Sequence, residues 1–383
     1  MSPQDVATSK HRRRPVPGKG FRKSRKGCYN CKRRRVKCSE DRPACAQCGR
    51  MDLVCDYPAA QPSTLASPLH APSAHCSSMV LSFNDLRFFH HFLIAAYPSV
   101  PSGFDNFWKD VVAMAPEYDF LVHSILGMGA QHLTIHASAN FSREALYHRV
   151  KAIQTLNKSL SQPCLSNADG DARRAAIMTL MFQSSYMPDG MMDFLSTLRG
   201  WMIISKAVPP DFEESSFRLF TIDAYVETMR NRISNPGEID QASATALEDF
   251  SASLRTLAPH CRGVAEVQYL STMENIVELA KVSFTEACLK LVPCIAMTNK
   301  LDDKEFENFI DSRNHTAQAV LAHFFMLLCL LDTAAFGARA QTFAFPRPVL
   351  LSWIKNVAKK VPSKYRHCMI WPAQMAALLE AQM

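Results

Sequence analysis

Six cysteines near the start of the chain repeat one spacing, Cys-x2-Cys-x6-Cys, at an offset of 17 residues. The two triplets are Cys28, Cys31 and Cys38, then Cys45, Cys48 and Cys55. A tetrahedral zinc ion takes four thiolate ligands, so two ions need eight ligand positions. Six cysteines fill eight positions only when two of them bridge both ions. By the symmetry of the repeat, the bridging ligands are expected to be Cys28 and Cys45, which open the triplets. Cys31 and Cys38 would complete one ion, and Cys48 and Cys55 the other.

The same cysteines permit two other arrangements. A single zinc ion held by Cys28, Cys31, Cys45 and Cys48 has acceptable spacing. It leaves Cys38 and Cys55 without a role at matching positions. A disulfide framework needs an oxidising compartment, whereas the N-terminus has no apolar signal core and the chain contains 13 cysteines, an odd number. The two-zinc arrangement is favoured, and zinc content per chain separates it from the one-zinc arrangement.

The cysteine region resembles the fungal binuclear zinc-cluster (Zn2Cys6) transcription factors. The likeness is carried by GCYNCKRRRVKC at Gly27 to Cys38 and SEDRPACAQC at Ser39 to Cys48, including Pro43 between the halves. The resemblance implies two Zn2+ per chain, double-stranded DNA as partner and a place in the nucleus.

The distribution of charge independently favours a polyanionic partner. Residues 1–57 contain 16 Lys and Arg against 5 Asp and Glu, whereas the remaining residues contain 27 against 30. The excess positive charge therefore lies on the cysteine region and the segment before it. Concentration of positive charge on a metal-stabilised module is typical of proteins that bind DNA phosphates.

The two halves of the repeat carry different charge, and this predicts which half faces DNA. Between Cys31 and Cys38 lie five basic residues, whereas the second half has Arg50 alone, beside Asp52. A short helix after Cys31 would turn several of these side chains to one side. The candidate DNA-contacting residues are Lys32, Arg33, Arg34, Arg35 and Lys37.

One of these residues is expected to read a base. In the resembled family, the residue four after the second cysteine is usually a base-reading Lys, and many members read CGG triplets. This chain has Arg35 there, which resembles the sterol-uptake-control branch, whose members read a TCG-containing element. An Arg can donate two hydrogen bonds to guanine in the major groove. We expect Arg35 to read a base and Lys32 to position the module.

The segments around the cysteine region indicate a four-part organisation. Residues 1–27 form a basic arm too polar to fold alone, suited to phosphate contacts and nuclear import. Residues 28–57 form the zinc module, residues 58–80 a linker rich in Pro, Ser and Ala, and residues 81–383 a large regulatory domain. No heptad pattern occurs in residues 58–80, so a dimer would have to form through the large domain. No membrane span is expected.

The large domain is predicted to be all-α, because apolar residues recur at helical spacing and only 13 glycines occur in 383 residues. Its likeness to the regulatory region of the same family lies in segments such as Phe120 to Leu133, Tyr147 to Ile153 and Met187 to Gly190. The expected helices are one containing Leu86 to Leu93, then 119–136, 143–160, 171–186, 191–204, 217–233, 265–280, 284–297, 305–331 and 350–357.

The composition of the large domain raises the question of a small-molecule site. Flexible methionines suit an adaptable apolar cavity, although Met and Phe at helical spacing also form ordinary cores. In the resembled family, the sterol-uptake-control type binds a sterol in this domain, and close relatives govern secondary-metabolite gene clusters. An apolar ligand is one candidate partner. The residues concerned include Met178, Met181, Met187, Met191, Met192, Phe324, Phe325 and Met326.

The sequence predicts no enzyme. His132 and His136 lie one helical turn apart, but Leu133 stands where a His-Glu-x-x-His metalloprotease has its glutamate. No nucleophile elbow, phosphate loop or Rossmann glycine pattern occurs. We therefore predict a nuclear, sequence-specific transcription regulator of RNA polymerase II genes, in secondary or sterol and lipid metabolism, that also contacts the transcription machinery. The alternative is a nucleic-acid-binding interaction or sensor protein without strong sequence preference.

Overall fold

The computed structural model describes residues 27–57, 80–98, 107–137, 139–218, 220–233, 240–336 and 345–383. The expected basic arm and nearly all of the expected linker lie outside these residues. The chain divides into two compact units, residues 1–71 and 72–383. Helices and turns account for the secondary structure of the described residues, which contain no strand, and the predicted all-α class is confirmed.

The first unit contains two short helices, α1 (Tyr29–Arg34) and α2 (Ala46–Gly49). Each begins directly after the first cysteine of a triplet. Cys28 caps α1 by accepting a hydrogen bond from the Cys31 N–H, and Cys45 caps α2 by accepting one from the Cys48 N–H. The helix starts are thus set by the thiols that were expected to bind metal.

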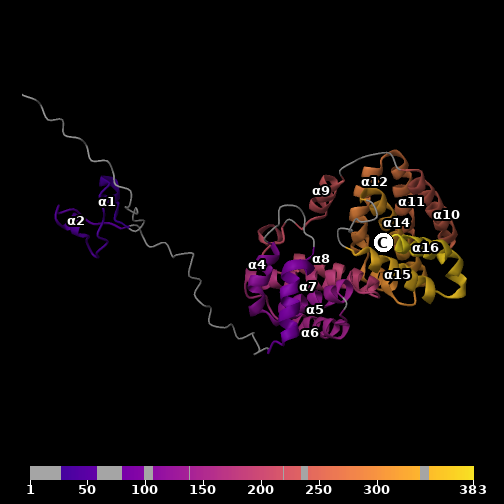
Figure 1. Cartoon of the computed structure of the whole chain (residues 1–383), viewed down its shortest axis with the longest axis horizontal. Coiled ribbons are helices and arrows are strands. Elements are labelled where there is room, and N and C mark those ends of the chain that lie inside the picture. Colours follow the sequence, from indigo (N-terminus) through magenta and orange to yellow (C-terminus); the bar gives the residue numbers. More distant parts are fainter. Residues whose placement is uncertain are drawn as a thin grey trace, which may run out of the picture. The chain divides into compact units, whose positions relative to one another are not determined.

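The second unit is a helical array (Figure 1). Its α-helices are α3 (Phe83–His91), α4 (Phe107–Met114), α5 (Asp119–His136), α6 (Ser142–Leu160), α7 (Asn167–Ser184), α8 (Met191–Ala207), α9 (Ile222–Arg232), α10 (Gln241–Leu257), α11 (Val264–Val282), α12 (Phe284–Leu291), α13 (Asp303–Ile310), α14 (His315–Phe336), α15 (Arg347–Lys360) and α16 (Ser363–Ala381). Short segments of tighter or wider helix are η1 (Phe92–Ala96), η2 (Ala115–Glu117), η3 (Phe212–Glu214), η4 (Ala258–His260) and η5 (Val292–Lys300).

Two central helices organise this unit. α5 packs against α3, α6 and α7, while α14 packs against α10, α11, α12, α15 and α16, as Figure 1 shows for the C-terminal half. α3 passes close to α5 at Gly129, where a Cβ would lie 2.3 Å from the Phe88 carbonyl oxygen. α14 is long and apolar enough to cross a bilayer, but 78% of its apolar window is buried among the other helices. In the C-terminal half of the second unit, α14 is therefore the central core helix.

Several expected helices differ from the structure, and local side chains explain why. The expected helix 305–331 is two helices, because Asp311 and Asn314 accept backbone N–H groups of Arg313 and Ala317 and end the first helix at Ile310. The expected helix 217–233 begins at Ile222, since Thr221 caps it by accepting the Ala224 N–H.

Other differences involve proline or weak patterns. The expected helix 284–297 becomes a 3-10 helix after Leu291, where Pro293 follows. Helices α4, α10 and α16 were not predicted, and α16 contains Pro372 in its interior. The range 119–136 agrees with α5 at both ends.

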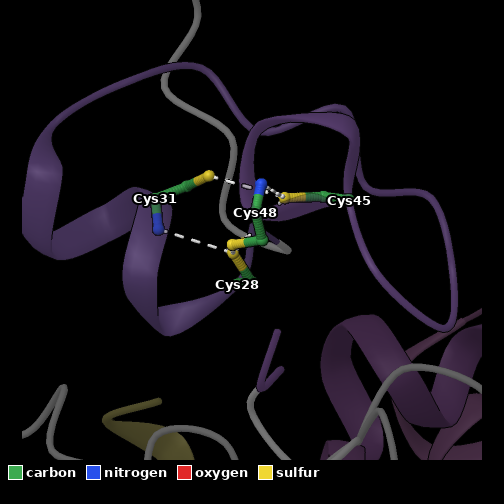
Figure 2. Close-up of side chains that lie close together, drawn as sticks. All are labelled: Cys28, Cys31, Cys45 and Cys48. Carbon is green, nitrogen blue, oxygen red and sulfur yellow. Dashed lines mark hydrogen bonds between the residues drawn. The ribbon is translucent and has the colours of Figure 1, made fainter. Parts of the chain in front are cut away.

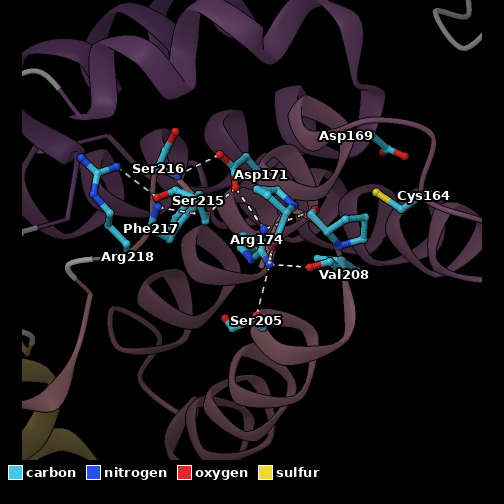
Figure 3. Close-up of polar contacts among 12 residues, drawn as sticks. Cys164, Asp169, Asp171, Arg174, Ser205, Val208, Ser215, Ser216, Phe217 and Arg218 are labelled. Atoms are coloured by element: carbon cyan, nitrogen blue, oxygen red, sulfur yellow. Dashed lines mark hydrogen bonds and ion pairs between the residues drawn. The ribbon is translucent and has the colours of Figure 1, made fainter. Parts of the chain in front are cut away.

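A buried arginine closes the end of α8 (Figure 3). The Arg174 side chain, from α7, is fully buried and donates to the carbonyl oxygens of Ser205 and Val208. It also donates to Pro210 O at 2.6 Å and to Asp171 Oδ1 at 3.1 Å. The last carbonyls of a helix have no partner within the helix, so this guanidinium supplies them with donors. The contacts of Arg174 thus have a structural role at the end of α8.

Candidate metal centre and its basic surface

The six cysteines of the repeat come together in the first unit, where they form its interior. Five are buried, with exposed fractions of 6% or less, and Cys55 is partly buried. Among the described residues of this unit, Cys55 and Tyr57 are the partly buried apolar residues that pack against the five. The module therefore has sulfur where a larger domain has an aliphatic core.

The spacing of the sulfurs fits shared tetrahedral ligands. Cys28 Sγ lies 3.7 Å from Cys45 Sγ and 3.6 Å from Cys48 Sγ, and Cys31 Sγ lies 3.6 Å from Cys45 Sγ (Figure 2). Two thiolates on one tetrahedral zinc ion, each at about 2.3 Å, lie about 3.8 Å apart. Cys28 and Cys45 each approach the other half as well as one another, as bridging ligands must.

The two remaining cysteines join opposite sides of this group. Cys38 interacts with the sulfurs of Cys31 and Cys45, and Cys55 interacts with that of Cys48. Four sulfurs, those of Cys28, Cys31, Cys45 and Cys48, lie within 4.8 Å of one another and are the set of the one-zinc arrangement. The positions of Cys38 and Cys55 beside them supply the further ligands that a second ion needs.

Backbone N–H groups point at the sulfurs in matching pairs. Cys28 N donates to Cys38 Sγ at 3.4 Å, and its counterpart Cys45 N donates to Cys55 Sγ at 3.3 Å. The N–H groups of Cys31 and Cys48 donate to the first sulfur of their own triplet, both at 3.4 Å. Hydrogen bonds of this kind stabilise thiolates. The repeat seen in the sequence is therefore a repeat of the three-dimensional structure.

The thiols cannot all ionise in this interior without added positive charge. Burial raises the pKa of Cys48 to about 12 and raises that of Cys31 further. Burial also opposes ionisation of Cys45, but the Cys48 N–H and neighbouring thiols lower its pKa to about 6. A coordinating metal ion deprotonates a thiol outright. The donor set thus fits a pair of dications.

Contacts outside the cysteines hold the two halves together, and sequence reasoning missed them. Tyr29 N donates to Asp56 O at 2.8 Å, and Asn30 Nδ2 donates to Val54 O at 2.7 Å. The Tyr57 hydroxyl donates to Asp41 O at 2.7 Å and lies 3.8 Å from Cys38 Sγ. The paired residues are far apart in the sequence and belong to no recognised motif, so these contacts could not be predicted from the sequence.

The five candidate DNA-contacting side chains are all exposed. The expected helix begins at Tyr29, earlier than predicted, and ends at Arg34. Lys32, Arg33 and Arg34 are therefore consecutive, about 100° apart around the axis, and helical spacing does not place them on one face. They surround the C-terminal end of α1, where the helix dipole favours positive charge.

Arg35 lies just beyond α1 in the left-handed backbone region, with φ of 53°. Its counterpart in the second half, Asp52, has φ of 50°. Val36 N donates to Cys31 O and Leu53 N donates to Cys48 O, both at 3.1 Å. The chain turns in the same way in both halves, but only the first half carries a basic side chain at that point.

The large unit contains an apolar cavity of about 180 Å³ among α7, α8, α9, α12, η5 and α14. Its wall is formed mainly by Met, Phe, Leu and Ile side chains, with Asp332 as its acidic residue. Met178 and Met181 line it, among the methionines noted in the sequence. Asp332 pairs with Arg347 at 3.1 Å, while burial raises the pKa of Asp332 to about 6.

The histidines noted in α5 form part of a helix interface. His132 Nδ1 lies 2.9 Å from His91 Nε2 of α3, and the His132 and His136 rings are 4.2 Å apart. His123 Nδ1 lies 2.9 Å from His148 Nδ1 of α6. Burial lowers the pKa of His132 to about 3 and of His123 to about 4, so both are neutral near pH 7.

A two-ion cysteine centre with an exposed basic turn, followed by a helical domain, defines the class of zinc-cluster transcription regulators. Residues 26–63 match the fungal Zn(2)-Cys(6) binuclear cluster domain, and residues 86–226 match the fungal specific transcription factor domain. The predicted resemblance to the fungal zinc-cluster transcription factors is confirmed. The cluster domain binds two zinc ions, as expected, and this class of proteins is not one of enzymes.

Curated relatives match parts of the chain. A Zn(2)-C6 fungal-type transcription factor, afumD, from Aspergillus fumigatus is 34% identical over 136 residues, covering 32% of this chain and 36% of the relative. Sterol uptake control protein 2 of Saccharomyces cerevisiae is 63% identical over 35 residues, 9% of this chain and 4% of the relative. Its namesake from Candida albicans is 54% identical over 39 residues, 10% of this chain and 6% of the relative. The matched segments thus span well under two thirds of these relatives. No solved structure matches the chain.

The buried histidines predict that acid weakens the helical domain. The folded-state pKa values of His123 and His132 lie below the unfolded value of 6.5, so the unfolded chain binds more protons once the pH falls below 6.5. Because both side chains are partly exposed, we expect a loss of only about 1–2 kcal/mol of unfolding free energy between pH 7 and pH 5. Urea unfolding at several pH values measures it. His123→Gln combined with His132→Gln should flatten the dependence, and an unchanged slope in that variant contradicts the assignment.

Proposed function

We propose that this chain is a nuclear, sequence-specific DNA-binding regulator of genes transcribed by RNA polymerase II. The observation that supports the proposal most is the exposed basic turn on a cysteine-held centre. All five basic residues are exposed: three form the last turn of α1 and two follow it, namely Lys32, Arg33 and Arg34, then Arg35 and Lys37. In this proposal, one zinc ion is held by Cys28, Cys31, Cys38 and Cys45, and the other by Cys28, Cys45, Cys48 and Cys55.

The zinc ions would have a structural role. They supply the positive charge that keeps six buried sulfurs ionised and fix the orientation of α1. The module would remain strongly basic, since six thiolates cancel the four charges of two zinc ions and add only two negative charges. Arg33 Nη2 lies 3.3 Å from Asn30 Oδ1, which orients one guanidinium along the helix. The basic end of α1 would then enter the major groove, with most of these side chains on phosphates.

Target genes in secondary metabolism or in sterol and lipid metabolism belong to the same proposal. The likeness of the cluster to two proteins named for sterol uptake control supports it, as does the apolar cavity of the helical unit. The boundaries 1–27, 28–57, 58–80 and 81–383, contact with the transcription machinery, and a dimer formed through the helical unit complete the proposal.

Metal removal tests the central claim. We expect the full chain to contain two zinc ions in the cluster and to bind a selected DNA site in the presence of a large excess of unrelated DNA. Exhaustive chelation should unfold the module and weaken specific binding about a thousandfold or more, because a module with a sulfur interior has no other core. Electrophoretic mobility shift before and after chelation measures this. Binding that resists chelation, or that unrelated DNA competes away equally, favours the non-specific alternative.

Replacement of Arg35 tests the base-reading role. In a selection from random duplexes, Arg35→Ala should lose about 1–3 kcal/mol of discrimination at one base position. Arg50→Ala is the matched control, because Arg50 is an exposed arginine in the second half, and it should leave the selected sequence unchanged. Lys32→Ala should weaken binding about equally at all sequences and reduce the salt slope by about 1. An unaltered preference in Arg35→Ala contradicts the assignment.

We propose, second, that the cavity receives an apolar small molecule. A cavity of about 150 Å³ is known to bind benzene, so a space of about 180 Å³ takes a guest of that order as it stands. A larger apolar molecule would require Met178 and Met181 to change rotamer, and methionine does so readily. Regulation would then follow from stabilisation of the helices around the cavity.

A thermal-shift experiment on the full chain tests this proposal. Small aromatics, sterols and terpenoids at about 100 times Kd should stabilise the fold by about 2.7 kcal/mol. Leu198→Trp fills the cavity wall and should abolish the shift, whereas Leu146→Trp at an exposed position on α6 should retain it. A shift that persists in Leu198→Trp, or none with any apolar compound, contradicts the proposal.

A further inference from the structure

A second group of metal-type ligands lies in the helical unit, far along the sequence from the zinc module. His260, His367 and Cys368 each offer one ligand atom, and these atoms lie within 4.8 Å of one another. His260 ends η4, directly after α10, whereas His367 and Cys368 lie on α16. The group therefore joins two elements about a hundred residues apart in the sequence. We propose that these three side chains form a transition-metal site, with zinc as the expected ion.

The distances suit coordination. Cys368 Sγ lies 3.3 Å from His367 Nε2. A sulfur and a nitrogen bound to the same tetrahedral zinc ion lie about 3.5 Å apart, given bonds of about 2.3 and 2.0 Å. The His260 and His367 ring centroids are 5.4 Å apart. One ring nitrogen of His260 lies within 4.8 Å of the ligand atoms of both His367 and Cys368.

The hydrogen bonds made by the three side chains explain only part of their convergence. Cys368 Sγ donates to Thr256 O at 3.4 Å, and that contact accounts for the thiol alone. His260 and His367 make ring contacts with each other, and His260 also contacts Tyr365. Two imidazoles and one thiol converge at the surface end of α10, and their shared chemistry is affinity for a borderline-soft dication.

Metal binding at this group is coupled to proton release, because a thiol binds a metal ion as the thiolate and an imidazole binds it in the neutral form. Binding breaks the S–H bond of Cys368, forms a sulfur–metal bond and releases one proton to solvent. The affinity should consequently fall as the pH is lowered.

The electrostatic surroundings contain both signs of charge. Lys364 and Arg262 oppose a cation, while Glu266 and Glu274 act on the adjacent Cys261 and favour one. The thiolate formed on binding cancels one of the two charges of the ion. Three protein ligands leave a fourth position for water, as in zinc sites with an open coordination position. The ion would pin the C-terminal helix to the end of α10 and make the stability of this region depend on zinc supply.

Metal counting on the full chain tests the site. We expect the chain to bind three equivalents of zinc after equilibrium dialysis, and His367→Ala and Cys368→Ser to bind two. Cobalt added to the chain that holds only two equivalents of zinc should occupy this site and give a thiolate-to-cobalt charge-transfer band, which both variants lose. Zinc released during the cobalt addition is measured at the same time, and no release means that the cluster keeps its two zinc ions.

The variants include a control for misfolding and a control for the loss of an unrelated thiol. His367 is exposed, so His367→Ala should fold even if replacement of the buried Cys368 does not, and circular dichroism of the metal-free variants verifies this. Cys164→Ser replaces a partly exposed thiol elsewhere in the same unit and should retain the third ion. Binding of only two equivalents by the unsubstituted chain, or a third ion that survives His367→Ala, overturns the proposal. Neither result bears on DNA binding by the zinc module, because DNA affinity is not the readout.

Discussion

Everything in the N-terminal unit depends on the sharing of sulfur between positive charges. Over residues 27–57, its buried apolar interior is cysteine, with Tyr57 and Cys55 packed against it. A chain segment of this size lacks the apolar surface that would offset its loss of conformational entropy, and below about 40 residues a metal or disulfide is usually needed. The starts of α1 and α2 are also set by Cys28 and Cys45, which accept hydrogen bonds from the following turns. One set of atoms therefore determines both the core and the secondary structure.

The helical unit is stabilised in the opposite way, by apolar burial around α5 and α14. Its polar interior groups sit at places where helices end or meet. Arg174 supplies donors to carbonyl groups at the end of α8, and Trp353 Nε1 donates to Met187 O at 2.7 Å. Such groups are costly to bury without partners, and here they connect segments that are distant in sequence. The same packing leaves space among several helices that are distant in sequence, so the cavity is a property of the whole array.

The sequence predicted what short-range spacing encodes. The cysteine repeat was visible because metal ligands need fixed separations, and the range 119–136 was predicted correctly because α5 is long and continuously apolar. The break at residues 311–314 was missed because side-chain capping outweighed the apolar pattern. α10 was missed although Leu247, Phe250, Leu254 and Leu257 recur at helical spacing. The pairing of Asn30 with Val54, the cavity and the His260 group depend on tertiary contacts, which spacing along the chain does not specify.

Comparison of the two halves of the repeat also distinguishes the backbone conformation, which they share, from the exposed side chains, which differ. Arg35 and Asp52 occupy equivalent left-handed positions, with φ of 53° and 50°. Aspartate tolerates this region, whereas a long side chain there costs about 1–2 kcal/mol relative to an ordinary conformation, and glycine would relieve the strain. The first half nonetheless carries an arginine at that turn, exposed and flanked by other basic residues. Glu40 adopts the same region with φ of 64°, so the backbone conformation alone does not mark a contact site. The two turns differ in their side chains, because only the turn of the first half presents a cation to a partner, as the base-reading role proposed for Arg35 requires.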